Sequence, residues 1–131
     1  MAKITEDMKA LIKGQQAFIA TSTPDGIPSI APKGSTRALD EEHIIFAESA
    51  GKRTLDNLKN NPKVAVIVCD STQMKCLRFS GTAELFTDGP LYEQGKERMA
   101  KMGAPAPQAM VKVKVEEIYD CGAPGFGERV D

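Results

Sequence analysis

The chain has 131 residues, of which 41% are hydrophobic and 27% charged, and its formal net charge is −1. These values are typical of a globular protein, so we expect a single domain over residues 1–131. Because 17 basic and 18 acidic residues are interspersed, no broad positive surface is expected for nucleic acid. No apolar run resembles a membrane span or a secretory signal. We therefore expect a cytoplasmic protein with neither nucleic acid nor membrane as a partner.

The chain begins with a pattern that predicts a short helix over residues 5–14. Thr5 can cap this helix, and Met8 and Ile12 lie at helical spacing before Gly14. Two further helical patterns follow later in the sequence. The three expected helices cover residues 5–14, 52–61 and 88–103.

Apolar and β-branched runs separated by turn residues predict about six strands. Pro32 and Gly34 interrupt the second run, so another group could approach its backbone closely. The run KVAVIVCD is almost continuously apolar, and both its faces are expected to be covered. Gly81 predicts a bulge or a bend. The expected strands cover residues 16–22, 28–39, 43–47, 63–70, 74–86 and 108–119, and a glycine-rich tail occupies residues 119–131.

The helix expected over residues 52–61 begins with charges of the unfavourable sign. Lys52 and Arg53 open it, although the N-terminus of a helix already carries a partial positive charge. A phosphate at this end would bind the free backbone N–H groups, both cations and the Thr54 hydroxyl. The alternative is that both cations extend into solvent.

The interrupted segment APKGST offers another set of polar groups. Lys33 supplies a cation, and Ser35 and Thr36 supply hydroxyls that could complete a phosphate site. The free backbone beside Pro32 and Gly34 could contact a planar heterocycle. An irregular edge strand without a ligand explains the same pattern.

The sequence offers no evident catalytic side chain or metal site. His43 is the only histidine, and the three cysteines, Cys69, Cys76 and Cys121, form no C-x-x-C pair. Reduced thiols are expected, with Cys69 and Cys76 more simply explained by packing in the core than by a redox pair across a hairpin. Any chemistry would therefore come from a bound cofactor.

Three consecutive segments resemble one known family. The strand ending in IIFAES, the segment GKRTLDNLKNNPKVAVIV and the strand LRFSGTAELF are similar to the FMN-binding split-barrel family related to pyridoxamine 5'-phosphate oxidase. The resemblance implies a mainly β fold, a six-stranded antiparallel split β-barrel with a few helices, and a homodimer with FMN between its subunits. The cofactor-binding residues that it implies are Ala31, Pro32, Lys33, Gly34, Ser49, Lys52, Arg53, Thr54 and Arg78.

The resemblance implies an FMN-dependent oxidoreductase whose electron donor and acceptor, small molecules or proteins, are not identified. In this interpretation Arg78 and the tail over residues 119–131 reach the partner subunit's flavin. Two alternatives remain open, a reductase that uses F420 and a flavin carrier without a substrate. The chain has no Trp and lacks the Arg-rich, aromatic C-terminal segment of true pyridoxamine phosphate oxidases, so oxidation of pyridoxamine phosphate is not expected.

Overall fold

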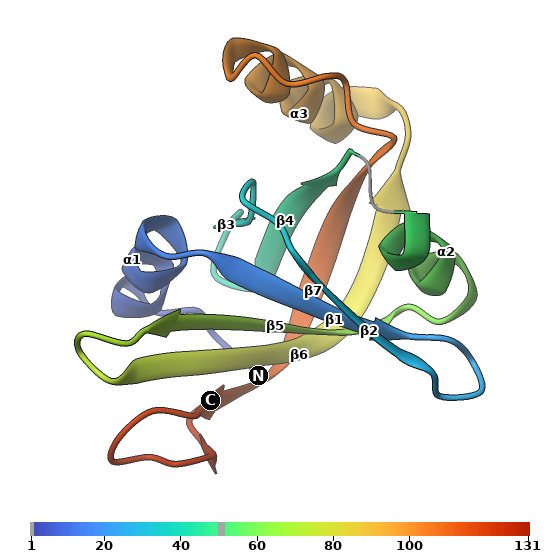
Figure 1. The fold of residues 1–131 in the computed structure, drawn as a ribbon. Helices are drawn as coiled ribbons and strands as arrows, with labels where there is room; N and C mark the ends of the chain where they lie inside the picture. Colours follow the sequence, from blue (N-terminus) through green and yellow to red (C-terminus); the bar gives the residue numbers. More distant parts are fainter. Residues whose placement is uncertain (1, 50–51) are drawn as a thin grey trace.

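The computed structural model describes residues 2–49 and 52–131. Within these residues, eight strands form one sheet and three helices pack around it. Figure 1 shows the sheet curled into a half-open barrel. None of the described helices is long and apolar enough to cross a membrane. The helices are α1 (Glu6–Gly14), α2 (Lys52–Asn60) and α3 (Gly89–Lys101), and the strands are β1 (Ala17–Ser22), β2 (Pro28–Pro32), β3 (Arg37–Ala38), β4 (His43–Glu48), β5 (Lys63–Asp70), β6 (Lys75–Phe86), β7 (Ala109–Asp120) and β8 (Glu128–Arg129).

The sheet confirms the predicted mainly β, antiparallel split barrel, with two strands more than expected. Its order is β2-β1-β5-β6-β7-β4-β3, with β8 on β7, and every pair is antiparallel. The run expected over residues 28–39 divides into β2 and β3, because a turn at Gly34 and Ser35 follows Pro32. The tail adds β8. Short turns join β1 to β2 and β5 to β6, as in hairpins.

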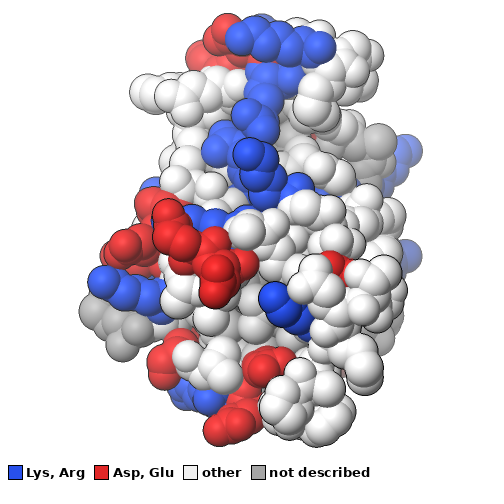
Figure 2. Space-filling model, turned by 90° about the vertical axis from the view of Figure 1, so that its left-hand side faces the viewer, with Lys and Arg blue, Asp and Glu red and all other residues white. Residues whose placement is uncertain are grey.

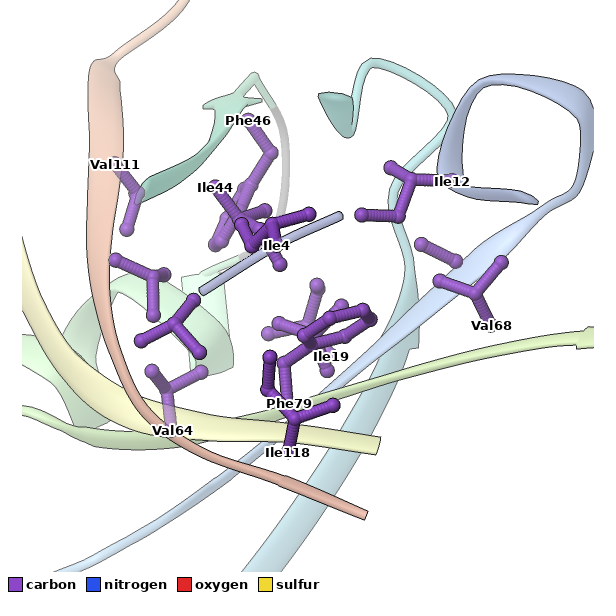
Figure 3. Packing of buried hydrophobic residues seen from close by; sticks show 14 of the residues in the cluster. Ile4, Ile12, Ile19, Ile44, Phe46, Val64, Val68, Phe79, Val111 and Ile118 are labelled. Carbon is purple, nitrogen blue, oxygen red and sulfur yellow. The ribbon is translucent and has the colours of Figure 1, made fainter. Parts of the chain in front are cut away.

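The core lies inside the curl of the sheet. Ile19 from β1, Phe46 from β4 and Phe79 from β6 are fully buried there, and Figure 3 shows them packed among isoleucine and valine side chains from other elements. Ile12 brings α1 into the same cluster. The Thr5 hydroxyl accepts a hydrogen bond from the Met8 N–H, 3.3 Å away, and so caps α1 as predicted.

The bulge predicted at Gly81 is present. The pairing of β6 with β7 shifts register between Ser80 and Gly81. A Cβ atom at Gly81 would collide with the backbone carbonyl of Lys114, so this close approach of the two strands requires glycine. Beyond the bulge, Ala83 and Leu85 keep an apolar face toward the core.

Only one face of β5 is covered, which corrects the expectation for KVAVIVCD. Val64, Val66 and Val68 point into the core, while Ala65 and Ile67 on the other face are half-buried. The curl of the sheet packs one side of each strand, and no described element covers the outer side of β5. The apolar outer residues are therefore left on the surface of the single chain.

The structure corrects the expectation of reduced thiols, with Cys69 and Cys76 packed in the core. Cys69 and Cys76 form a disulfide, and Cys121 is a free, half-buried thiol. The register of the β5–β6 hairpin sets Cys69 directly opposite Cys76, with 4.1 Å between their Cα atoms. Cys69 is exposed on the outer face, so its side chain does not contribute to the core.

Candidate functional site

The start of α2 carries two cations and no acidic residue in its first turn. Lys52 and Arg53 are exposed, and neither forms an ion pair with any residue that the structure describes. Thr54 is buried beside them, with 2% of its surface exposed. The two charges add to the positive end of the helix dipole. This corner of the molecule therefore attracts an anion.

Ser49 lies between the end of β4 and this helix. Its hydroxyl oxygen is buried and has no hydrogen-bond partner among the described residues. A buried hydroxyl without a partner is costly, and an anion that accepts its proton would remove that cost. Ala50 and Gly51, between Ser49 and the predicted phosphate-binding helix start, lie outside the described residues.

Two asparagines fix α2 against β1. The Asn57 side-chain N–H donates to the Thr21 hydroxyl at 3.0 Å, and Asn57 is almost completely buried. Just after the helix, the Asn61 side-chain N–H donates to the Ser22 hydroxyl at 3.0 Å. The apolar side of α2 is also buried, at Leu55 and Leu58. The position of the cationic helix start is therefore set by the fold.

The loop after β2 is bound to the end of β4. The Lys33 ammonium lies 2.8 Å from a Glu48 carboxylate oxygen, and the side chains are 11% and 0% exposed. The Ser35 hydroxyl accepts a hydrogen bond from the Ala47 N–H at 2.8 Å, and the Thr36 hydroxyl donates to the Lys33 carbonyl at 2.7 Å. The cation and the two hydroxyls predicted to complete a phosphate site thus all have partners within the chain.

These contacts bring the two predicted segments together. Lys33 follows β2 and contacts Glu48, which directly precedes Ser49 and the start of α2. Strand β2 is at the edge of the sheet, so one side of its backbone is not paired in the ladder. Pro32 ends this strand and is exposed, while Ala31 is half-buried opposite Ile19.

Arg78 is not part of this group. It lies on β6, where its guanidinium carbon is 4.5 Å from the centre of the Tyr119 ring. In the sheet order, three strand-to-strand steps separate β2 from β6, which corresponds to about 14 Å. The prediction that Arg78 reaches the flavin of the partner subunit stays a prediction.

The C-terminal tail folds back on its own chain. Strand β8 pairs with β7, and Arg129 lies 3.1 Å from a Glu117 oxygen and 2.8 Å from an Asp131 oxygen. Asp131 also accepts a hydrogen bond from the Ile118 N–H at 3.0 Å. Hydrogen bonds from Arg129 and Ile118 lower the pKa of Asp131 to about 2. The tail predicted to reach the partner subunit is thus bound to β7.

A second group of cations was not predicted from the sequence. Lys13, Arg37 and Arg98 line a cavity of about 130 Å³ between α1, β3 and α3, which we call the basic pocket. None of the three forms an ion pair with the residues described. Burial, together with the nearby charge of Arg98, lowers the pKa of Arg37. Figure 2 shows a band of Lys and Arg that descends from the height of α3 on this side of the molecule.

The basic pocket adjoins the loop after β2, because Gly34 and Ser35 also line it. Three methionines form an apolar part of its wall. A site of this kind fits a small anion, or the anionic group of a larger molecule with an apolar body. No local motif signalled it, because Lys13, Arg37 and Arg98 come from three elements far apart in the sequence. The methionines are Met99, Met102 and Met110.

A larger cavity lies away from these residues. It has a volume of about 610 Å³ and is bounded by α1, the β5–β6 hairpin and the end of β7. None of the predicted cofactor-binding residues lines it. In the described part of the chain, no group of His, Cys, Asp or Glu is arranged to hold a metal ion.

Comparisons with known proteins agree with the arrangement of strands and helices. HupZ of Group A Streptococcus is 33% identical, with a TM-score of 0.89 over 98% of this chain and 99% of that one. An uncharacterized protein of Methanocaldococcus jannaschii is 32% identical over 124 residues, which cover 92% of this chain and 82% of that protein.

Two more distant structures share the fold. An FMN-binding protein of Syntrophomonas wolfei has a TM-score of 0.75 at 18% identity, over 86% of this chain and 82% of that one. An F420 reductase has a TM-score of 0.67 at 21% identity, over 88% of this chain and 98% of that one. The family model described as pyridoxamine 5'-phosphate oxidase matches residues 4–122. The chain therefore belongs to the pyridoxamine 5'-phosphate oxidase family.

Proposed function

We propose that the protein binds FMN and uses it as an oxidoreductase, with the FMN phosphate at the start of α2. The observation that carries this proposal is the pair of exposed cations, Lys52 and Arg53, without an acidic partner among the described residues. The buried Thr54 and the unpartnered Ser49 hydroxyl add hydrogen-bonding groups. A phosphate dianion would satisfy the charges and the hydroxyl together.

We place the flavin ring along the loop after β2. Gly34 is exposed, and a Cβ atom there would meet nothing closer than 4.0 Å. No described neighbour therefore requires glycine at this position, whereas a ring lying against the backbone would. Ala31 and Pro32 lie on the edge strand that leads into the loop. The flavin supplies electron or hydride transfer, while the chain binds and orients it.

The basic pocket is our candidate site for the molecule that exchanges electrons with the flavin. It shares Gly34 with the proposed ring site, and its three cations lack carboxylate partners among the described residues. A donor or acceptor with a carboxylate or phosphate would neutralise them. Substrates without an anionic group are expected to react more slowly.

F420 in place of FMN is the second candidate, and the F420 reductase of the same fold favours it. A flavin carrier without a substrate is the third. Titration of the purified protein with FMN and with F420, followed by absorbance, distinguishes the cofactors. Oxidation of NADH or NADPH with added acceptors then distinguishes an enzyme from a carrier. Saturable binding of FMN and turnover are expected, and a protein that binds neither cofactor contradicts the proposal.

We further propose that two copies of the chain pair through the outer face of β1 and β2 and the adjoining residue Ile67 of β5, with the Cys69 end of β5 outside the interface. Phe18 and Ile30 are 42% and 67% exposed, and Ile67 is half-buried on the same face of the neighbouring strand. Exposed apolar side chains that adjoin one another in this way are typical of an interaction surface. A second copy also explains the apolar residues on both sides of β5. Light scattering is expected to give twice the mass of one chain for the natural protein. For the Phe18→Glu variant it is expected to give the mass of a single chain.

A further inference from the structure

The three cysteines of the chain lie in one row across three strands. Cys69 on β5 pairs with Cys76 on β6, and the N–H of Cys121, just after β7, donates to the Cys76 carbonyl at 2.8 Å. Cys76 is therefore the direct neighbour of both other cysteines. The Cα atoms of antiparallel neighbours lie about 4.5 to 5.5 Å apart, which is within reach of a disulfide.

The three side chains share the outer face of the sheet. Arg78 and Tyr119 stack on each other across β6 and β7, and Cys76 and Cys121 lie two residues from them along the same strands. Alternate residues of a strand point to the same side. Cys69 is exposed, and Cys76 and Cys121 are half-buried. A small molecule can therefore approach the sulfur of Cys69 from solvent.

We propose that Cys69, Cys76 and Cys121, which we call the cysteine row, form a thiol–disulfide exchange site for small thiols, with Cys76 as the central sulfur. The inference stands on the register and exposure of the cysteines and does not depend on the proposed flavin site. Exposed disulfides are the ones that exchange. A free thiol beside such a disulfide can attack it, so that the disulfide forms between a different pair of cysteines.

Two steps follow from this geometry. A small thiolate attacks the Cys69 sulfur, the bond to Cys76 breaks, and Cys76 leaves as a thiolate. A second small thiolate then releases Cys69, so two small thiols are oxidised to their disulfide while the protein is reduced to a dithiol. In the other step the Cys121 thiolate attacks Cys76, and Cys69 leaves as an exposed thiolate. That second step moves the disulfide without net oxidation or reduction.

Peptide mapping tests the proposal, because trypsin separates the cysteines into peptides 64–75, 76–78 and 115–129. The full chain is equilibrated with one equivalent of oxidised glutathione, blocked with N-ethylmaleimide and digested without reductant. We expect 64–75 linked to 76–78, and a smaller fraction of 76–78 linked to 115–129. Native protein that retains three blocked thiols under these conditions overturns the proposal. Addition of 2-mercaptoethanol to the oxidised native protein is expected to free Cys69 and Cys76, and a disulfide that reacts only after unfolding also overturns it.

Matched variants identify the central sulfur. In Cys69→Ser, oxidised glutathione is expected to link Cys76 to Cys121 almost completely. In Cys76→Ser, Cys69 and Cys121 are two strands apart, about 10 Å, and no internal link is expected. Circular dichroism checks that each variant is folded. A folded Cys69→Ser variant without the Cys76–Cys121 disulfide would contradict the proposed role of Cys76. A Cys76→Ser variant with a disulfide between Cys69 and Cys121 would contradict it as well.

Discussion

Two arginine-bearing regions of this protein use charge in opposite ways. At the C-terminus, Arg129 lies 3.1 Å from Glu117 and 2.8 Å from Asp131, and these contacts bind the tail to β7. At the start of α2, Arg53 and Lys52 have no ion-pair partner among the described residues. Both regions are on the surface, so exposure does not separate them. The difference teaches that charges paired within the chain serve the fold, whereas unpaired charges of one sign mark a place for a ligand.

Lys33 combines the two situations, because it lies beside the proposed flavin yet is paired with a buried carboxylate. Lys33→Met is expected to lower the free energy of unfolding by about 3 kcal/mol, since it removes one ion-pair partner of the buried Glu48 carboxylate. Urea unfolding measures this loss. Lys63→Met is the control, because the Lys63–Glu116 pair is exposed, and a change below about 1 kcal/mol is expected there. A Lys33→Met variant as stable as the natural chain would contradict a structural role for the pair.

Reversal of charge at α2 separates binding from stability. Arg53→Glu is expected to weaken FMN binding about 100-fold, or about 2.8 kcal/mol, because attraction to the phosphate becomes repulsion. The free energy of unfolding is expected to change by less than about 0.5 kcal/mol. Quenching of FMN fluorescence measures the affinity.

Arg129→Glu is the matched control for this variant. It makes the same charge change at an arginine whose partners belong to the fold, so we expect unchanged FMN affinity and a loosened tail. Equal weakening of FMN binding in both variants would mean that net charge, rather than the position of Arg53, controls affinity.

Removal of one cation from the basic pocket is expected to raise the stability of the fold slightly. Arg98→Met removes a like charge beside Arg37 and is expected to raise the free energy of unfolding by up to about 0.5 kcal/mol without an added anion. Lys101→Met on the same helix is the control, since Lys101 pairs with Glu97, and no gain is expected there. Urea unfolding in dilute buffer measures both, and a loss in Arg98→Met would contradict the idea of uncompensated repulsion.

The contacts that bind the C-terminal tail to β7 are expected to weaken in acid. The pKa of Asp131 is lowered to about 2 in the folded chain, from an ordinary value near 3.9 for an aspartate side chain. A lowered pKa stabilises the fold above the ordinary value, and this stabilisation is lost as the pH falls from about 4 to about 2. The protection of the Ile118 amide from hydrogen exchange, relative to its intrinsic rate at each pH, is expected to fall in that range. Asp131→Asn, which lacks the carboxylate, is expected to exchange quickly already at neutral pH.

Much of the fold followed from local signals in the sequence. The three helices and the bulge at Gly81 were predicted, because caps, turns and periodicity are properties of neighbouring residues. The division of the second run into β2 and β3 was missed, since a short edge strand depends on its partner in the sheet. The uncovered face of β5 was missed for the same reason, because an apolar run does not specify what packs on each side.

The candidate site was likewise predictable from the sequence only where the signal was local. The cationic start of α2 was visible as an unfavourable pattern within one helix. The pairing of Lys33 with Glu48, however, joins residues 15 positions apart, and the basic pocket joins three separate elements. Packing of Cys69 and Cys76 in the core was preferred over a disulfide, because free cysteines commonly behave as small hydrophobic residues. The register of the β5–β6 hairpin, however, decides which cysteines meet.

The central claim is that the start of α2 binds the phosphate of the cofactor, and riboflavin tests it most directly because it carries the same ring without that phosphate. Titration of the purified protein with FMN and with riboflavin, followed by flavin fluorescence, compares the two affinities. We predict that FMN binds at least about 100-fold more tightly, and that Arg53→Glu removes most of this difference. Equal affinities for FMN and riboflavin in the natural chain would contradict the account.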